Sequence, residues 1–478
     1  MPSSEPTIQP SVKDNVHAIK IAFNFTQDIV IQSIQLNESD SFTIVYLSGM
    51  ADPGQFLKKI PLQSRQKQSD QLIEVVPTKQ LHTIKEIVDE IIKGNTITLF
   101  DGMTTALSYD TNAVNTRSVN EPDNEVSIKG PHDGFNESMK NNIALVRFHC
   151  PSPLLTVEYL QLGTITHNKV AVLSMKGIVN EKILQEVHNR LKRIPYEAVL
   201  DIQYIEEWIT DNRWTLFPLI ESTERPDRVV GALLEGRVAI MLNGVPMTLM
   251  VPYLFLQTFQ VSEDYYWRYY LASALRLLRF FCGFVTLYLP AFFVATITFH
   301  HEFLPTTLLM SIAQGHEPVP YPTLVEVLLM EGAFEILREA GIRLPRQVGS
   351  AVSIVGALVL GQAAVQAGIV SPVTVILVAF TGICSFTLPT NTGAYAIRML
   401  RFVIIIMGGL LGYVGIITAG ILLLVHLVSL RSFGIPYFSP LAPYSMYNST
   451  DIFIRRPHFL NKKRPSIFRV EDDVRFRE

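Results

Sequence analysis

The sequence predicts a chain of two unlike halves: an α/β soluble N-terminal half made of two similar small subdomains, followed by a polytopic all-α transmembrane domain. Three observations lead to this fold class. Up to about Gly244 the 478-residue sequence carries charges throughout, as an ordinary soluble protein does. Between Leu271 and Leu430 long apolar runs dominate, several near the length of about 20 residues that crosses a bilayer as a helix. Within the first half, a local pattern of strand, turn and strand occurs twice.

In each repeat an apolar, β-rich run ends in Asp-Gly or Asn-Gly, the preferred residues of a two-residue hairpin turn. The first run is 94–102 (GNTITLFDG), after an amphipathic helix pattern over 83–93, and the second is 236–244 (GRVAIMLNG). Upstream, 42–49 and 169–177 are both strand-like runs that end in glycine. Such hairpins are common, so chance is the alternative. We interpret the pattern as an internal duplication.

The expected organisation has six segments. They are a disordered N-terminus (1–19), a first subdomain (20–110), a linker (111–141), a second subdomain (142–250), a transmembrane domain of four to five spans (251–432) and a basic C-terminal tail (433–478). The linker is rich in polar residues, glycine and proline and poor in apolar residues. The residues of its stretch 130–138 (GPHDGFNES) are more specific than a simple flexible linker would need.

Several function classes find no support. The net charge of -3 gives no electrostatic support for binding to nucleic acid. The cysteines Cys150, Cys282 and Cys384 lack short spacings and are interpreted as reduced packing residues. Phosphate-binding glycine loops, metal-ligand spacings and nucleophile elbows are absent from the sequence, and His132 beside Asp133 is interpreted as a solvated loop pair, so we expect neither an enzyme nor a cofactor. The first residues hold no apolar signal-peptide region, which favours a cytoplasmic soluble half.

An acidic helix is expected at 323–340. At 100° per residue, Glu331, Glu335, Glu339 and Arg338 fall within one arc. One interpretation is an interfacial amphipathic helix with a solvated edge. The other is a helix at membrane depth that faces a water-filled path, where ionisable residues usually mark ion routes. The glutamates form like-charge i,i+4 pairs, which are unfavourable unless solvated, paired with Arg338 or occupied by a cation.

The next apolar stretch, 348–370, has small residues at four-residue spacing, which lets helices approach closely in lipid. These candidate packing positions are Ala357, Gly361, Ala364 and Gly368. Gln362 and Gln366 share one face, as hydrogen-bonding contacts between helices or as the wall of a pore. The candidate ion-path residues are Gly361, Gln362, Gln366, Glu331, Glu335 and Glu339.

The sequence does not fix the number of membrane crossings or the side on which the C-terminus lies. Arg268, Arg276 and Arg279 precede the first span and place that end in the cytoplasm. From Arg455 on, eight Lys or Arg against four Asp or Glu favour a cytoplasmic C-terminus. Counting the acidic helix gives five crossings, which would put the tail on the other side of the membrane. Either the acidic helix does not cross, or the tail departs from this rule.

Short motifs in fixed order resemble one known family. They are 217–218 (FP), 223–229 (TERPDRV), 232–240 (ALLEGRVAI), 263–266 (EDYY), 304–306 (LPT), 337–345 (LREAGIRLP), 361–367 (GQAAVQA) and 432–434 (SFG). Over about 95–445 the chain is similar to the A subunit of the GerA-type spore germinant receptors. Glu224, Arg225, Pro226, Asp227 and Arg338 are motif positions to which the resemblance assigns a structural role.

The resemblance implies a multi-pass protein of the inner membrane of bacterial endospores, with the soluble half on the spore-core side. It implies two partners, a transporter-like B subunit and a lipoprotein C subunit, and a homo-oligomer that forms a nutrient-gated ion channel and triggers germination. The alternative is a non-conducting scaffold that relays the signal. A secondary transporter would show inverted repeats with broken helices, and the sequence shows no such pair. Asn243-Gly244 stands where the family usually has Asp-Gly, and the first 90 residues match poorly.

Overall fold

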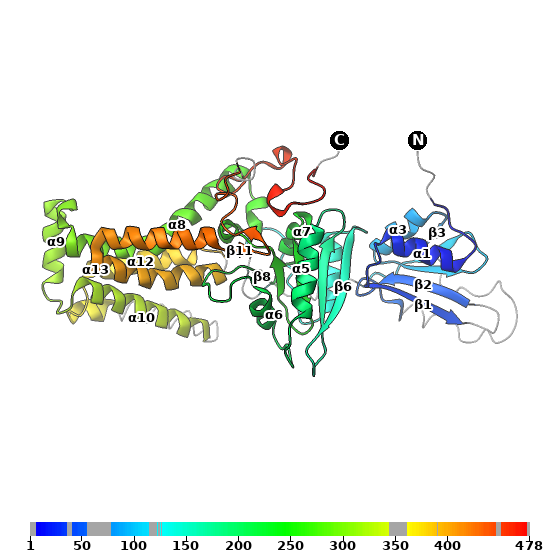
Figure 1. Cartoon of the computed structure of the whole chain (residues 1–478), viewed down its shortest axis with the longest axis horizontal. Helices are drawn as coiled ribbons and strands as arrows, with labels where there is room; N and C mark the ends of the chain where they lie inside the picture. The colour runs from blue at the N-terminus through cyan, green and yellow to red at the C-terminus, as the bar shows by residue number, and fades with distance from the viewer. Residues whose placement is uncertain are drawn as a thin grey trace.

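The computed structural model describes residues 6–35, 41–54, 78–113, 122, 125, 127–343, 361–389, 391–445 and 451–475. Figure 1 shows an elongated molecule with three parts in line: a bundle of helices, a second α/β unit and a first α/β unit. We call residues 6–113 the first unit, 127–254 the second unit, 255–429 the helical half and 430–475 the tail.

The first unit is one antiparallel sheet with helices packed against it. Its elements are α1 (Val12–Ala22), β1 (Ile29–Gln35), β2 (Ser41–Leu47), β3 (Lys79–Leu81), α3 (Ile84–Ile92), β4 (Thr96–Phe100) and β5 (Ala106–Tyr109). The strand order is β1-β2-β4-β5-β3. Helix α3 begins at a capping box of Thr83 and Glu86 and buries its apolar face against the sheet.

Helix α1 contradicts the disordered segment expected at 1–19 for the part that the structure describes, residues 6–19. Ser11 caps the helix, and Ile8 and Ile19 are buried in the same core as α3. A short helix of this composition is marginal alone and is stabilised by its tertiary packing, which composition does not report.

The second unit repeats the first with additional helices. Its elements are α4 (Met139–His149), β6 (Leu155–Leu162), β7 (Asn168–Met175), α5 (Glu181–Lys192), α6 (Ile202–Ile209), β8 (Glu221–Thr223), α7 (Pro226–Leu234), β9 (Val238–Leu242) and β10 (Thr248–Val251). The strand order β6-β7-β9-β10-β8 matches that of the first unit strand for strand. The duplication is confirmed, and β4 pairs with β5 and β9 with β10 as hairpins. The two-residue turns expected at Asp101-Gly102 and Asn243-Gly244 are wrong, because five residues, 101–105 and 243–247, join the strands in each case.

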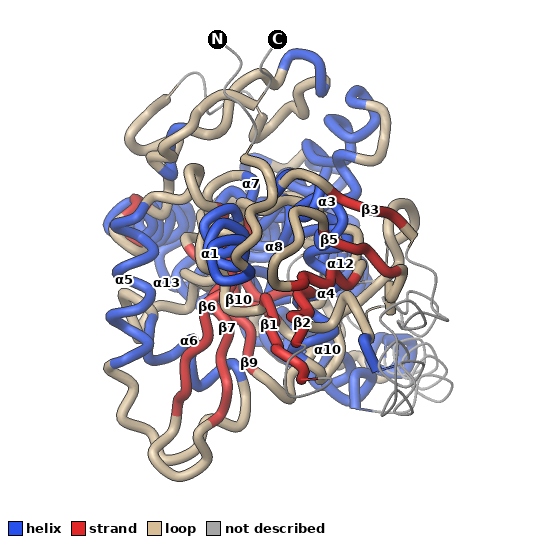
Figure 2. The backbone as a smooth tube through the Cα atoms, turned by 90° about the vertical axis from the view of Figure 1, so that its right-hand side faces the viewer, coloured by secondary structure: helices blue, strands red, loops and turns tan. Residues whose placement is uncertain are grey.

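Side chains alternate along the central strands of the second sheet, so both of its faces carry a core. Val170 and Val172 pack with α5 and α6, whereas Ala171 and Leu173 pack with α4 and α7. The β6–β7 hairpin extends away from the body of this unit, as Figures 1 and 2 both show.

The two units are joined along the edge strand β6. The backbone N–H of Gln27 donates to the carbonyl of Val157 (2.9 Å), and the N–H of Val157 donates to Thr26 Oγ1 (2.9 Å). Arg147 of α4 forms two hydrogen bonds with Asp28 (2.5 and 2.8 Å), and both side chains are buried. A buried, doubly bonded ion pair fixes the relative position of the units.

The helical half begins with two short 3-10 helices and continues with long apolar helices. In chain order they are η2 (Phe255–Phe259), η3 (Ser262–Tyr265), α8 (Tyr269–Phe299), η4 (His301–Phe303), α9 (Thr306–His316), α10 (Thr323–Arg343), α12 (Pro372–Phe386) and α13 (Asn391–Ser429). Residues 361–366 are also helical. In the described part of the chain, α8 and α13 are long and apolar enough to cross a membrane, and α12 is apolar but shorter.

Helix α13 is a helical hairpin rather than one helix. Gly412 has φ +61° and ψ −145°, which is not helical. A Cβ built on Gly408 would lie 3.2 Å from Ile416 Cγ1, although residues eight apart in a straight helix are about 12 Å apart. Ala396 and Leu427 share one cluster with the second unit, so both arms, 391–411 and 413–429, end beside it.

This hairpin decides at which end of the helical bundle the tail emerges. The turn at Gly412 contacts His300 at the end of α8, so the two lie at the end of the bundle far from the α/β units, which we call the far end. Helices α10 and α12 both start there, where Ser371 N–H donates to Glu326 (2.5 Å). Leu388, just after α12, packs with Phe259 near the second unit. The stretch 402–430 is therefore two antiparallel arms, and the tail leaves on the side of the α/β units.

The tail returns to the second unit and packs onto it. It contains β11 (Arg431–Ser432), β12 (Ile435–Pro436), η5 (His458–Leu460) and η6 (Ser466–Phe468). Phe468 is buried in the core of the second unit, and Asn180 Nδ2 donates to the carbonyl of Arg469 (3.2 Å). The tail therefore connects the helical half to the second unit a second time, besides the direct link into α8.

Candidate functional site

A cluster of buried charges lies inside the helical half, where α10, α12 and α13 meet. Glu331 and Arg401 are both 0% exposed, with Arg401 Nη2 2.8 Å from Glu331 Oε2. Thr381 Oγ1 of α12 donates to the other oxygen of Glu331 (3.3 Å). At Glu331 the charged edge of the acidic helix is therefore buried against α12 and α13 and is not solvated, whereas Glu339 further along the helix is exposed.

Glu335, one turn further along α10, is shared by several arginines. It lies 2.8 Å from Arg338, 3.2 Å from Arg401 and 4.0 Å from Arg398. The Tyr395 ring stacks against the guanidinium groups of Arg398 and Arg338. Two carboxylates face three guanidiniums, so the cluster in this state has no excess negative charge to offer a cation.

The other sequence-predicted ion-path residues lie apart from this cluster. Glu339 is exposed and pairs with Arg343 (2.7 Å) one turn later on α10. Gln362 and Gln366 are exposed on their helix, whereas Gly361 is buried and its Cβ position faces Val375 of α12 (3.5 Å).

The candidate packing positions are only partly described. Gly368 lies against Pro318 at the far end, with its Cβ position 3.1 Å from the Pro318 carbonyl oxygen. Ala364 is half-buried, and Ala357 lies outside the described residues. Gln366 is two residues from Gly368, so this helix ends near the far end of the bundle.

A second concentration of charge forms the junction, by which we mean the contact of residues 125 and 127–135, the start of α7, η3, the start of α8 and residues 451–458. The motif 224–227 builds the start of α7. Pro226 occupies the first helical position and Asp227 lies in the first turn, both favourable at a helix N-terminus. Arg225 donates to Asp227 (3.0 and 2.8 Å), and Glu224 is buried.

The motif also holds the linker and the start of the helical half together. Arg225 Nη2 donates to the carbonyl of Pro131 (3.2 Å), and Tyr266 OH donates to Asp227 (2.7 Å). Gly130 has φ +120°, and a Cβ there would lie 2.6 Å from the Tyr266 ring. The linker is therefore docked at the junction, and Gly130 is required because its backbone lies flat against an aromatic ring.

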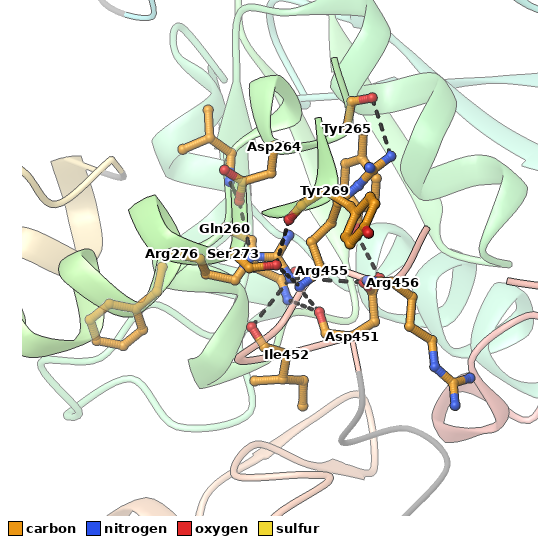
Figure 3. Close-up of polar contacts among 12 residues, drawn as sticks. Gln260, Asp264, Tyr265, Tyr269, Ser273, Arg276, Asp451, Ile452, Arg455 and Arg456 are labelled. Carbon is orange, nitrogen blue, oxygen red and sulfur yellow. Dashed lines mark hydrogen bonds and ion pairs between the residues drawn. The ribbon is translucent and has the colours of Figure 1, made fainter. Parts of the chain in front are cut away.

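Asp264 of η3 fixes the first turns of α8. It accepts hydrogen bonds from Arg276 Nε (3.0 Å) and Arg279, and Arg276 is 0% exposed. Arg276 also donates to the carbonyls of Asp451 and Ile452 in the tail. Figure 3 shows Arg276 between Asp264 and the tail residues, so one side chain of α8 bonds to both.

The tail contributes its own side chains to the junction. Tyr265 OH donates to the Asp451 carboxylate (3.0 Å), and Arg455 N–H donates to Ser273 Oγ of α8 (3.1 Å). Figure 3 shows these contacts gathered around the start of α8. Between α7 and η3 lies a cavity of about 210 Å³, and its lining includes the polar side chains of Asp227, Glu235 and Tyr265.

Sequence reasoning found part of these sites. It selected the acidic face and the 223–229 and 263–266 motifs, but it gave neither Arg401 nor Asp451 a role. Their partners lie 66 residues away for Arg401 and Glu335, and 186 away for Asp451 and Tyr265. No short spacing signals such pairs.

His149 clips the linker to α4 through Asp133. The Nε2–Oδ2 distance is 2.6 Å. The hydrogen bond to Asp133 raises the pKa of His149. Burial alone would raise the pKa of Asp133, but the hydrogen bond and charge of His149 outweigh it and the pKa is lowered.

The pair therefore stabilises the fold within one pH window. The His149 contribution is complete below its unfolded pKa of about 6.5 and is lost as pH rises through the raised folded pKa. The Asp133 contribution is lost as pH falls through the lowered folded pKa. We expect His149→Ala to lower stability by about 1 kcal/mol between roughly pH 4 and 6.5, and the difference to vanish in alkali.

The measurement is thermal unfolding of the solubilised full chain across this pH range. A double-mutant cycle with Asp133→Asn supplies the control, because it isolates the pair from other effects of each change. A His149→Ala effect that is equal at all pH values would contradict the assignment.

The long apolar helix α8 and the two apolar arms of α13, with two α/β units at one end, are compatible with a membrane-associated protein. Residues 17–467 match the family described as Bacillus/Clostridium GerA spore germination protein. The chain belongs to this family, and the resemblance to GerA-type A subunits is confirmed.

Named relatives agree with this assignment. The chain is 44% identical to spore germination protein KA of Bacillus subtilis (strain 168), over 98% of this chain and 88% of the relative. It is 39% identical to the uncharacterized membrane protein YfkQ of the same organism, over 96% and 92%. It is 35% identical to spore germination protein A1, also of B. subtilis, over 93% and 94%.

One solved structure also matches. It is the crystal structure of the N-terminal domain of the A subunit of the Bacillus megaterium spore germinant receptor GerK3. The match has 29% identity and a TM-score of 0.41, over 53% of this chain and 98% of that chain.

Proposed function

We propose that this chain is the A subunit of a nutrient germinant receptor and that several copies assemble in the inner membrane of the spore into a nutrient-gated ion channel. The relatives named as spore germination proteins support the receptor role. The helix that carries Gln362 and Gln366 lines the path in this proposal, with Ala357, Ala364 and Gly368 at the contact between copies.

The helical half is proposed to cross the membrane several times. The arms of α13, residues 391–411 and 413–429, are about 31 and 25 Å long at 1.5 Å per residue. A bilayer has a hydrocarbon core of about 30 Å, so each arm has the length of one crossing. Basic residues at the start of α8 and in the tail favour the spore-core side for the α/β units.

The observation that carries the channel proposal is the exposed polar face at Gln362 and Gln366. Both side chains are exposed although Gly361 beside them is buried against α12. An unpaired amide in lipid is unfavourable, and small neighbours such as Ala363 let another helix approach. A second copy of the chain on this face would either pair the amides or enclose water between them.

The charged cluster has a different place in this proposal. Glu331 and Glu335 are engaged by Arg401, so the described state is one in which these carboxylates are closed to a cation. Conduction past them requires Arg401 to move away, whereas Glu339 is already exposed. The path is therefore gated by separation of α10 from α13.

The transporter-like B subunit and the lipoprotein C subunit are the proposed partners. The junction is the part of the chain suited to relay their signal, because α8, the linker and the tail meet there in buried charge contacts. A shift of any one of them changes contacts of the other two.

The test is Gln362→Leu in spores that carry the complete receptor. We expect nutrient-triggered cation release to fall at least about tenfold, because a leucine on this face removes a polar group and fills the path. The matched control is Ile376→Leu, a change on the exposed face of α12. Unchanged release with normal protein levels would rule out a pore role for Gln362.

The scaffold alternative is tested with the purified chain in liposomes. The ion pair of Glu331 with Arg401 is the observation that favours the scaffold, because neither Glu331 nor Glu335 is free to bind a cation. A channel raises ion conductance across the liposome membrane, and a scaffold does not.

A further inference from the structure

Arg398 in the first arm of α13 is a buried cation that lacks a close acceptor. The residue is 5% exposed, and its Nε has no hydrogen-bond partner. The carboxylate of Glu335 lies 4.0 Å from this nitrogen, beyond the distance of a hydrogen bond. A guanidinium has five N–H donors and stays protonated in proteins, so burial does not remove its charge. The described part of the chain therefore leaves the Nε–H of Arg398 without an acceptor.

Arg401, one turn later on the same face of this arm, has two more unpaired donors. Its Nη2 lies 2.8 Å from Glu331 and 3.2 Å from Glu335, whereas its Nε and Nη1 have no hydrogen-bond partner. Residues three apart in a helix have Cβ atoms about 5–6 Å apart, so one small ligand is able to contact both guanidiniums. Native proteins leave few buried polar groups unpaired, and three in one cluster indicate a missing acceptor such as an ion.

The charges of this cluster do not balance. Of the side chains that the structure describes there, Glu331 and Glu335 are acidic and Arg338, Arg398 and Arg401 are basic. One positive charge is in excess, although none of the three arginine side chains is more than 11% exposed. A buried charge without a counter-charge is strongly unfavourable.

We propose that Arg398 and Arg401 bind one small monovalent anion of the chloride type. An anion accepts hydrogen bonds from the unpaired donors and also cancels the excess charge, whereas a water molecule does only the first. A divalent ion would leave an excess of the opposite sign. The exposures of 5% and 0% favour a free ion over a carboxylate or phosphate tethered to another molecule.

The anion has a defined effect at the proposed gate, and this part of the inference rests on the proposed function. Arg338 belongs to α10, whereas Arg398 and Arg401 belong to α13. With the anion bound, the charges balance and Arg401 stays paired with Glu331. Without it, repulsion among the three arginines favours the separation of α10 from α13. The anion therefore stabilises the closed arrangement.

The experiment measures anion binding by the purified full chain in detergent. Equilibrium dialysis uses radioactive chloride, with gluconate as the second anion to keep the ionic strength constant, and is expected to detect about one saturable site per chain. The unfolding midpoint is expected to rise by about 2–4 °C once chloride exceeds its dissociation constant several times, because the ion binds only the folded state.

Arg398→Gln removes the excess charge together with the donors of one guanidinium. We expect the affinity for chloride to fall at least about tenfold and the chloride-dependent rise of the midpoint to disappear. In gluconate the variant should be at least as stable as the unchanged chain, because its cluster is neutral. The matched control is Arg343→Gln on α10, whose side chain is 78% exposed and pairs with Glu339, and which should keep the site.

An equal rise of the midpoint in Arg398→Gln and in the unchanged chain would overturn the assignment to this cluster. Failure of the unchanged chain to bind chloride saturably would overturn it too, whether or not the variant folds. Conductance in liposomes separates this inference from the proposed channel. A chain that binds chloride without conducting keeps the anion site and overturns its effect on a gate, whereas a chain that conducts without binding chloride overturns the anion site alone.

Discussion

Replacing Arg401 with methionine is expected to destabilise the helical half by about 3–5 kcal/mol, because Glu331 would be left buried without its ionic partner. Glu331 keeps only the hydroxyl of Thr381 within hydrogen-bond distance, whereas Glu335 keeps Arg338. The loss should therefore come mainly from Glu331. The measurement is the unfolding midpoint of the purified chain in detergent.

The double variant Glu331→Leu/Arg401→Met is the decisive control. Replacing both members of a buried pair by apolar groups of similar size is often neutral, so we expect most of the lost stability to return. Equal destabilisation in the single and double variants would show that Arg401 acts through its contacts with Glu335 instead. In spores, the double variant would also lack the proposed closing contact and is expected to release cations without nutrient.

Asp264→Ala is expected to have the second large effect, a loss of about 3–5 kcal/mol at the junction, because it leaves Arg276 buried with no carboxylate within hydrogen-bond distance. Asp451 is the nearest replacement, at 3.9 Å from Arg276. The α/β units and the bundle keep their own cores, so the loss concentrates where they meet. Limited proteolysis between residues 255 and 268 should accelerate, and nutrient-triggered germination should fail at normal protein levels.

A charge change far from the junction separates this effect from general loss of a carboxylate. Glu302→Ala removes an exposed acidic residue at the far end of the bundle and is expected to leave both readouts unchanged. Normal germination by Asp264→Ala would mean that the signal does not pass from η3 to α8.

The duplication shows what local patterns can predict. The chain reversals near Gly102 and Gly244 are signalled by residues adjacent in sequence, because both glycines adopt the positive φ that glycine favours. The same logic predicted α3 from its amphipathic pattern. It did not find α1, whose stability comes from a core assembled by β2, β4 and α3.

The hairpin of α13 is a feature that local sequence patterns could not predict. Four glycines at 408–415 are compatible with a closely packed helix as well as with a turn. The neighbours decide between these forms: His300 and Phe299 of α8 enclose Gly412, and Leu324 of α10 encloses Gly409. Only the packed bundle therefore reverses the chain at this point, and with it the side on which the tail emerges.

The sequence by itself determined the family, the two-part fold class, the duplication and the presence of an acidic face, because each depends on residue types at short spacing. Only the tertiary structure decided that Arg401 neutralises Glu331, that Arg276 joins η3 to the tail and that Thr215 lies beside His426. Each of these pairs brings together residues from separate elements, and their free energy depends on distance and burial in the folded chain rather than on any local preference.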